Sequence, residues 1–110
     1  MSYFARVGML NTDREQLTKE QKTELFEAKV RHEYNVSKEE LHSKCRKRYI
    51  IEPRQIMMYV MRVHYGYRLE RIASYFDKNH STVIHAVKNI KNIMFSDKHF
   101  EQKLNVLINK

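Results

Sequence analysis

The stretch of residues 79–90 constrains the fold of this chain more than any other feature of its sequence. Its apolar residues Val83, Val87 and Ile90 recur at helical spacing, so one side of a helix can be buried there. Its first four residues instead carry short hydrogen-bonding side chains, at the end where a helix has free backbone N–H groups. A helix that buries one side and begins in this way has the layout of a DNA recognition helix.

The residues before this stretch predict a supporting helix. The apolar residues of the segment 69–76 recur at i, i+3, i+4 and i+7, which is typical of a helix of about two turns with one buried face. A polar turn at 77–80 separates this helix from a longer one that runs to about residue 95. A short helix, a tight turn and a longer helix with polar first residues together predict a helix-turn-helix.

Two capping boxes mark helix starts in the first half of the chain. In such a box a Ser or Thr is followed three residues later by Glu or Gln, and each side chain binds the other residue's backbone N–H. The box that begins at Thr18 predicts a helix of about 18–34, with Leu25 on its apolar face. The box that begins at Ser37 predicts a short helix of about 38–44.

A proline and a glycine define the next helix. Glu52 precedes Pro53 and is therefore disfavoured in helical geometry, so residues 45–52 are expected to form a loop. Proline suits the first position of a helix, where no backbone donor is needed. Gly66 can adopt the left-handed conformation that ends a helix, which predicts a helix of about 53–65.

These elements predict an all-α fold. Ser96 is expected to cap a last helix of about 97–109, and strand-like alternation is nearly absent. The prediction is a compact multi-helix domain, residues 18–110, which contains a helix-turn-helix and has a basic loop before its third helix. Residues 1–17 show no sustained periodicity, so they are expected to form a flexible N-terminal leader.

The positive charge of the chain is concentrated in its second part. Residues 1–44 hold eight Lys or Arg against eight Asp or Glu, whereas residues 45–110 hold thirteen against five and account for the whole net charge of +8. This asymmetry predicts a mixed-charge helical support followed by a unit that binds a polyanion.

Composition also excludes several classes. The longest apolar run, residues 56–61, is far too short to cross a bilayer, and the first residues lack the pattern of a signal peptide. The single Cys45 excludes an internal disulfide and a cysteine-rich zinc site. The expected location is the cytoplasm, in association with the nucleoid.

The pair Arg54-Gln55 and the stretch 69–90 resemble the C-terminal DNA-binding domain of the bacterial replication initiator DnaA. Within that stretch, residues 80–86, His-Ser-Thr-Val-Ile-His-Ala, are similar to the family's signature at the start of its recognition helix. The resemblance extends upstream and covers about residues 22–110. It implies a monomer that binds double-stranded DNA sequence-specifically at an AT-rich initiator-type box, with a role in replication initiation at an origin or in its regulation.

The resemblance implies a contact with DNA for each matching residue. Arg54, which follows the proline, is expected in the minor groove, where an arginine senses the narrow groove of AT-rich DNA. Thr82 is expected to hold a phosphate with its hydroxyl and the N–H groups of the helix start. The residues expected to contact base edges in the major groove are Asn79, His80 and Ser81. Those expected to contact phosphates are Arg46, Lys47, Arg48 and Arg62, and the predicted DNA-binding set is completed by Gln55, His85 and Lys88.

The sequence differs from the family at two points that bear on the predicted DNA contacts and cofactors. The family usually has Asp at the position of Asn79, where a carboxylate accepts from the amino group of cytosine, whereas an amide can also donate. The preferred base at that position therefore stays open. The two glycines of the sequence, Gly8 and Gly66, form no Gly-x-x-x-x-Gly-Lys phosphate loop, so neither a nucleotide nor another cofactor is expected.

The sequence also bears on functions other than DNA binding. A small metal-dependent nuclease would use histidines, but His80 and His85 lie about 140° apart around a helix, at ~100° per residue. They cannot readily share a metal, so no catalytic or metal-binding residue is predicted. A helical protein-interaction adaptor and a transcriptional regulator remain compatible with the predicted fold. RNA binding is disfavoured because the aromatic residues form no stacking platform.

Overall fold

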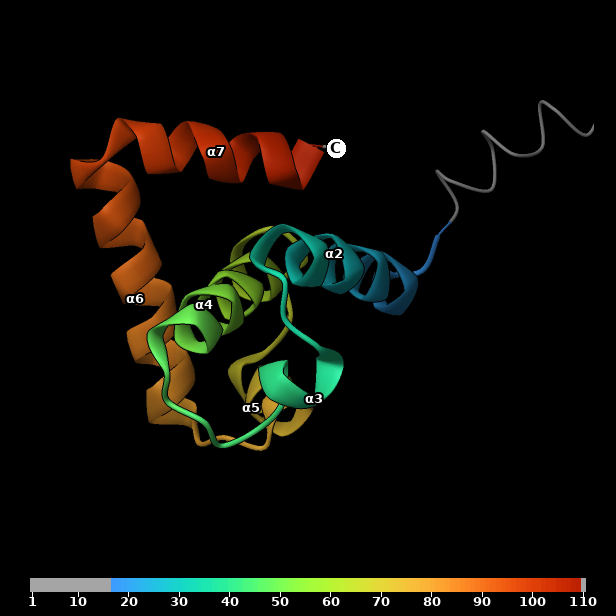
Figure 1. Cartoon of the computed structure of the whole chain (residues 1–110). Helices are drawn as coiled ribbons and strands as arrows, with labels where there is room; N and C mark the ends of the chain where they lie inside the picture. The colour runs from blue at the N-terminus through green and yellow to red at the C-terminus, as the bar shows by residue number, and fades with distance from the viewer. Residues whose placement is uncertain (1–16, 110) are drawn as a thin grey trace, which may run out of the picture.

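The computed structural model describes residues 17–109, which form six helices and no strand (Figure 1). The helices are α2 Lys19–Tyr34, α3 Lys38–Leu41, α4 Arg48–Val63, α5 Leu69–Phe76, α6 His80–Ser96 and α7 Lys98–Asn109. The predicted all-α class is therefore confirmed for the part of the chain that the structure describes. The predicted leader lies, apart from Leu17, outside the described residues.

Both predicted capping boxes are present. The Thr18 hydroxyl accepts a hydrogen bond from the backbone N–H of Gln21 at 3.1 Å, and the Gln21 side chain accepts from the backbone N–H of Thr18 at 2.9 Å. Ser37 and Glu40 make the same pair of bonds at 3.0 and 2.9 Å. These reciprocal bonds occupy backbone donors that a helix start leaves free. The capping-box pattern therefore predicted the starts of α2 and α3 correctly.

The start of α4 corrects the prediction of a loop at 45–52. The helix begins at Arg48, five residues before Pro53, so Arg48 belongs to a helix and the loop is confined to residues 42–47, the basic loop. Burial explains the difference, because the first turn places Ile50 in the core with 1% of its surface exposed. A proline inside a helix removes one backbone hydrogen bond, and this burial offsets that loss.

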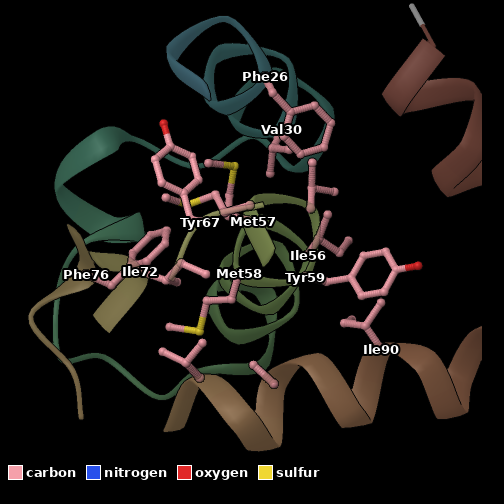
Figure 2. Packing of buried hydrophobic residues seen from close by; sticks show 14 of the residues in the cluster. Phe26, Val30, Ile56, Met57, Met58, Tyr59, Tyr67, Ile72, Phe76 and Ile90 are labelled. Carbon is pink, nitrogen blue, oxygen red and sulfur yellow. The ribbon is translucent and has the colours of Figure 1, made fainter. Parts of the chain in front are cut away.

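Helix α4 is the centre of the hydrophobic core (Figure 2). Its residues Met57 and Met58 are fully buried. Phe26 and Val30 of α2 pack on one side of it, and Ile90 of α6 lies on another side. One predicted core position is wrong, because Leu25 of α2 is 53% exposed. A buried α4 fixes the positions of α5 and α6, and thus of the helix-turn-helix that these two helices form.

The last helix is capped by a different residue from the one predicted. Asp97, not Ser96, accepts hydrogen bonds through its carboxylate from the backbone N–H groups of His99 and Phe100, both at 3.1 Å. The Ser96 hydroxyl instead donates to the carbonyl of Asn92 at 3.0 Å, so α6 extends through Ser96. Figure 1 shows α7 at the end of the domain opposite α3 and α5.

None of the helices described here combines the length and the apolar character that a membrane crossing requires.

Candidate nucleic-acid interface

The first residues of α6 are held by an asparagine cap. The side-chain oxygen of Asn79 accepts from the Thr82 backbone N–H at 2.9 Å and from the Thr82 hydroxyl at 3.0 Å. The Thr82 N–H and hydroxyl thus both donate to Asn79 in the structure, and a contact of the Thr82 hydroxyl and the N–H groups of the helix start with a phosphate stays a prediction. The backbone N–H groups of His80 and Ser81 are the first two of the helix, which have no partner within a helix. Both side chains are exposed.

The turn between α5 and α6 fixes the relative position of these two helices. Asp77 ends α5 in the left-handed conformation, with φ of 54°, and its backbone N–H donates to the carbonyl of Ser74 at 3.2 Å. The next backbone N–H, that of Lys78, donates to the carbonyl of Ala73 at 2.8 Å. These bonds satisfy carbonyls at the end of α5 and direct the chain straight into the cap of α6.

Between residues 80 and 90, helix α6 has one buried side and one exposed side. Val83, Ala86 and Ile90 are buried against the core. His85 and Lys88, two of the predicted DNA contacts, are exposed on the other side. Packing of the buried side against the core therefore holds these exposed side chains in a fixed position on the surface.

The side chain of Arg54, which is predicted to enter a minor groove, faces the basic loop in the structure. It is buried, with 6% of its surface exposed. The guanidinium donates to the carbonyls of Leu41 and Ser43, both at 2.9 Å, and to those of Cys45 at 3.1 Å and Glu40 at 3.4 Å. In this conformation the guanidinium is turned toward the carbonyls of the loop, and the contact of Arg54 with a minor groove stays a prediction. Burial also lowers the pKa of Arg54, yet arginine remains charged in proteins.

The bonds of Arg54 also explain why α3 is shorter than predicted. The carbonyl of Leu41 would accept from the N–H of Cys45 in a continuing helix. In the structure that carbonyl accepts from Arg54, and the Cys45 N–H donates to the Ser43 hydroxyl at 3.1 Å. Helix α3 therefore ends at Leu41, and the following residues form a loop whose carbonyls point to one buried cation.

The basic loop and the start of α6 lie side by side. The Lys78 ammonium donates to the carbonyl of Ser43 at 3.3 Å, which joins the turn before α6 to the loop. A hollow of about 340 Å³ lies between the loop, α4 and α6. The polar and charged side chains that line this hollow are Lys44, Arg46, Arg54, Gln55, Lys78, Thr82 and His85.

Positive charge is concentrated at this hollow. The pKa of Lys78 is lowered, first by burial and then by the nearby charge of Arg54, with smaller contributions from Lys44 and Arg46 that Asp77 partly opposes. Arg46, Lys47 and Arg48 are exposed. Cations that crowd one another in this way favour a bound anion, which relieves their mutual repulsion.

Two other predicted contacts are placed differently from the rest. The Gln55 side-chain oxygen accepts from the Asn89 amide at 2.7 Å, a bond that joins α4 to α6. Arg62 donates to the carbonyl of Tyr67 at 2.9 Å. It lies eight residues after Arg54, about 12 Å further along α4, so the structure does not bring it to the basic loop.

The structure adds two residues that the sequence analysis missed. Lys44 and Lys78 both line the hollow between the loop and α6. A signal for each was available, because Lys44 adjoins the basic run 46–48 and Lys78 immediately precedes the asparagine cap. Neither belongs to the predicted set, because a lysine in a loop or turn is ordinarily solvated.

Within residues 17–109, no three His, Cys, Asp or Glu side chains are grouped so that they could hold a metal ion.

The short helix α5, the tight turn and the capped α6, together with the adjoining basic loop, define a helix-turn-helix domain. The family of the bacterial DnaA protein helix-turn-helix matches residues 24–90. The chain belongs to this family. A DnaA helix-turn-helix domain is not an enzyme.

Relatives of this chain are chromosomal replication initiator proteins DnaA. The protein from Mesorhizobium japonicum is 40% identical over 79 residues, which are 71% of this chain and 16% of the relative. The protein from Caldanaerobacter subterraneus is 34% identical over 90 residues, which are 82% of this chain and 20% of the relative. This chain thus spans no more than about a fifth of the length of these two relatives.

Proposed function

We propose that this domain binds double-stranded DNA sequence-specifically at a site of the DnaA-box type. One observation carries the proposal: Lys78 joins the turn before α6 to the basic loop, which Arg54 holds against α4, so that the loop and the start of α6 form one cationic surface. In the proposed complex the start of α6 enters a major groove, and the basic loop follows the adjacent backbone and minor groove. One such surface per domain fits binding as a monomer.

Asn79, His80 and Ser81 are the proposed base contacts in the major groove. Because the backbone N–H of Thr82 requires an acceptor, the oxygen of the Asn79 amide is used in the cap and only its NH₂ group faces away. That group donates, so it suits a base that presents an acceptor, such as guanine O6, guanine or adenine N7, or thymine O4. Asn79 is therefore proposed to disfavour cytosine, which presents an amino donor.

Arg46 is proposed as a second arginine of the minor groove, in addition to Arg54. It is exposed and lies in the basic loop, where it lines the hollow beside the start of α6. Its side chain can therefore reach a groove next to the one that α6 enters, and an arginine there favours a narrow AT-rich groove. Lys47 and Arg48 are proposed phosphate contacts, and Lys44 and Lys78 join them.

We propose a role in replication initiation or its regulation, because the relatives are named chromosomal replication initiators. This chain corresponds to a small part of their length, and no phosphate loop is present in its sequence. We therefore propose DNA recognition alone as the activity of the domain.

Replacing Asn79 separates its capping role from its proposed base contact. Asn79→Ala is expected to lower the free energy of unfolding by about 1 kcal/mol, because the Thr82 N–H loses its acceptor. Asn79→Asp keeps an acceptor and is expected to keep the stability, while its carboxylate shifts the preferred base at one position toward cytosine. Urea denaturation measures the first effect, and selection of DNA sites by each variant measures the second. An unchanged base preference in Asn79→Asp would remove Asn79 from the base contacts.

Replacing Lys47 tests a proposed phosphate contact. Lys47→Ala is expected to weaken binding to all duplexes to a similar degree, because a phosphate contact carries no sequence information. It should also reduce the slope of log affinity against log salt by about one. Fluorescence anisotropy at several salt concentrations gives both quantities. Lys22→Ala, an exposed lysine of α2, is the control that should leave the slope unchanged.

Selection from random duplex DNA with the purified chain tests the proposed function. Enrichment of one AT-rich sequence, bound more tightly than its scrambled version, is the expected result. An absence of enrichment would favour a protein-interaction adaptor instead. Incubation of the duplexes with and without EDTA tests for a metal-dependent nuclease, and no cleavage is expected under either condition.

A further inference from the structure

The first residue of the basic loop is a histidine whose ring lies between two helices. Nε2 of His42 is 3.2 Å from Oε1 of Glu27 in α2, and its Nδ1 is 3.2 Å from the backbone carbonyl oxygen of Tyr75 in α5. The ring also stacks on Phe76, with the two ring centroids 4.9 Å apart. His42 therefore connects the start of the loop both to α2 and to the first helix of the helix-turn-helix.

The two oxygen atoms that face the His42 ring are both acceptors. A backbone carbonyl and an ionised carboxylate accept hydrogen bonds and donate none, and a neutral imidazole has only one N–H. A neutral His42 would thus donate to one of these oxygens and turn a lone pair toward the other. The imidazolium ion has two N–H groups and donates to both. The positions of the acceptors therefore fit the charged form of His42.

The carboxylate of Glu27 requires a cation that also donates a hydrogen bond. Its side chain is only 3% exposed, and a buried charge is costly unless it is paired and hydrogen-bonded. The Tyr75 hydroxyl donates to Oε1, and burial together with this bond raises the pKa of Tyr75, so the hydroxyl keeps its proton. Arg31 Nε lies 3.8 Å from Oε2, which is beyond hydrogen-bond distance. The imidazolium of His42 supplies both the charge and the bond.

The carbonyl of Tyr75 also favours a cation, because it lies in the last turn of α5. The last carbonyls of a helix have no partner within the helix, and the helix end carries a partial negative charge. A hollow of about 200 Å³ borders His42, and its other titratable side chains are Glu20, Glu24, Lys38, Tyr67 and Arg71. The two carboxylates among them offset the two cations. The His42 side chain is 24% exposed, so it can exchange protons with solvent.

We propose that the imidazolium of His42, paired with Glu27, is a positioning group for DNA binding, which holds the start of the basic loop against α2 and α5. This inference rests on the proposed function. Loss of the second ring proton leaves one of the two acceptors without its donor, and the loop start is then less firmly held. The next residue is Ser43, whose carbonyl accepts from both Arg54 and Lys78. A displaced Ser43 disturbs the cationic surface, so affinity for DNA decreases as the pH rises.

Proton NMR of the full chain with ¹⁵N-labelled histidines tests the charged form directly. At pH 6 both ring N–H groups of His42 are expected to give resolved signals, because hydrogen bonds slow their exchange with water. The exposed rings of His80 and His99 should give none. His42→Gln identifies the two signals by their loss. A single resolved N–H for His42 would overturn the proposal.

Glu27→Gln tests the effect on DNA binding, because it removes the charge and keeps the contacts. A neutral His42 can donate to the Tyr75 carbonyl and accept from the glutamine NH₂ group. Fluorescence anisotropy on the selected duplex at pH 6 and pH 8.5 measures the affinity of each protein. Between these values the unmodified chain is expected to lose about fivefold more affinity than Glu27→Gln, the effect of one hydrogen bond. Titration of His80 and His85 is common to both proteins and cancels in this comparison.

Glu33→Gln is the matched control, with the same change of charge on α2 at a residue that pairs with Lys103. It should keep the pH dependence of the unmodified chain. Equal pH dependence in Glu27→Gln and the unmodified chain would overturn the inference, while specific binding by both would leave the proposed function intact. If the unmodified chain selects no duplex at either pH, the proposed function fails, and the NMR signals of His42 still decide whether its ring carries both protons.

Discussion

Replacement of Arg54 by methionine is expected to lower the free energy of unfolding by about 3 kcal/mol, since buried carbonyls lose charged donors. Methionine has a similar length and keeps the packing of the side-chain stem, but it cannot donate to Leu41, Ser43 or Cys45. The basic loop should then lose its fixed conformation, and binding to DNA should weaken as a consequence. Urea denaturation and fluorescence anisotropy on one preparation measure both effects.

Arg46→Met is the matched control for this prediction. Arg46 is exposed, so its replacement should change the free energy of unfolding by no more than about 0.5 kcal/mol. It should nevertheless weaken binding, most of all to the AT-rich duplex. If Arg54→Met were as stable as the unmodified chain, the structural role assigned to Arg54 would be wrong. If Arg46→Met bound DNA normally, the minor-groove proposal would fail.

Replacement of His80 by alanine is expected to weaken binding to the selected duplex by about 1–3 kcal/mol and to leave binding to random duplexes nearly unchanged. His80 is exposed at the first position of α6, where a side chain can reach a base edge. Because its side chain is exposed, the variant should fold normally. The ratio of the two affinities measures the loss of specificity.

His99→Ala is the control for the His80 variant. His99 is an exposed histidine near the start of α7, and its replacement should change neither affinity. Equal losses on selected and random DNA by the His80 variant would show that this histidine contacts phosphate rather than a base.

The elements with local signals could be predicted from the sequence. Thr18 and Ser37 mark helix starts because their capping partners lie three residues away, within the same turn. The helix-turn-helix is also encoded locally, since the stripe of α5 and the polar cap of α6 are separated by a short turn. The fold class and the position of the capped start of α6 follow from these signals.

The features that depend on distant contacts could not be predicted. Arg54 binds carbonyls nine to fourteen residues earlier in the chain, and nothing in the local sequence indicates where its guanidinium points. The first turn of α4 forms despite Pro53 because Ile50 is buried in the tertiary structure, an effect that outweighs the local preference. In both cases contacts between residues distant in the sequence, and not local sequence preferences, determine the conformation.

The start of α6 and the basic loop are proposed to form one DNA-binding surface. Titration of ¹⁵N-labelled protein with the selected duplex, followed by NMR of the backbone amides, tests it most directly. The amides of residues 44–48 and 78–85 are expected to show the largest shifts at the same DNA concentrations, with those of α7 unaffected. Large shifts confined to α2 or α7, with the basic loop and the start of α6 unchanged, would contradict the claim.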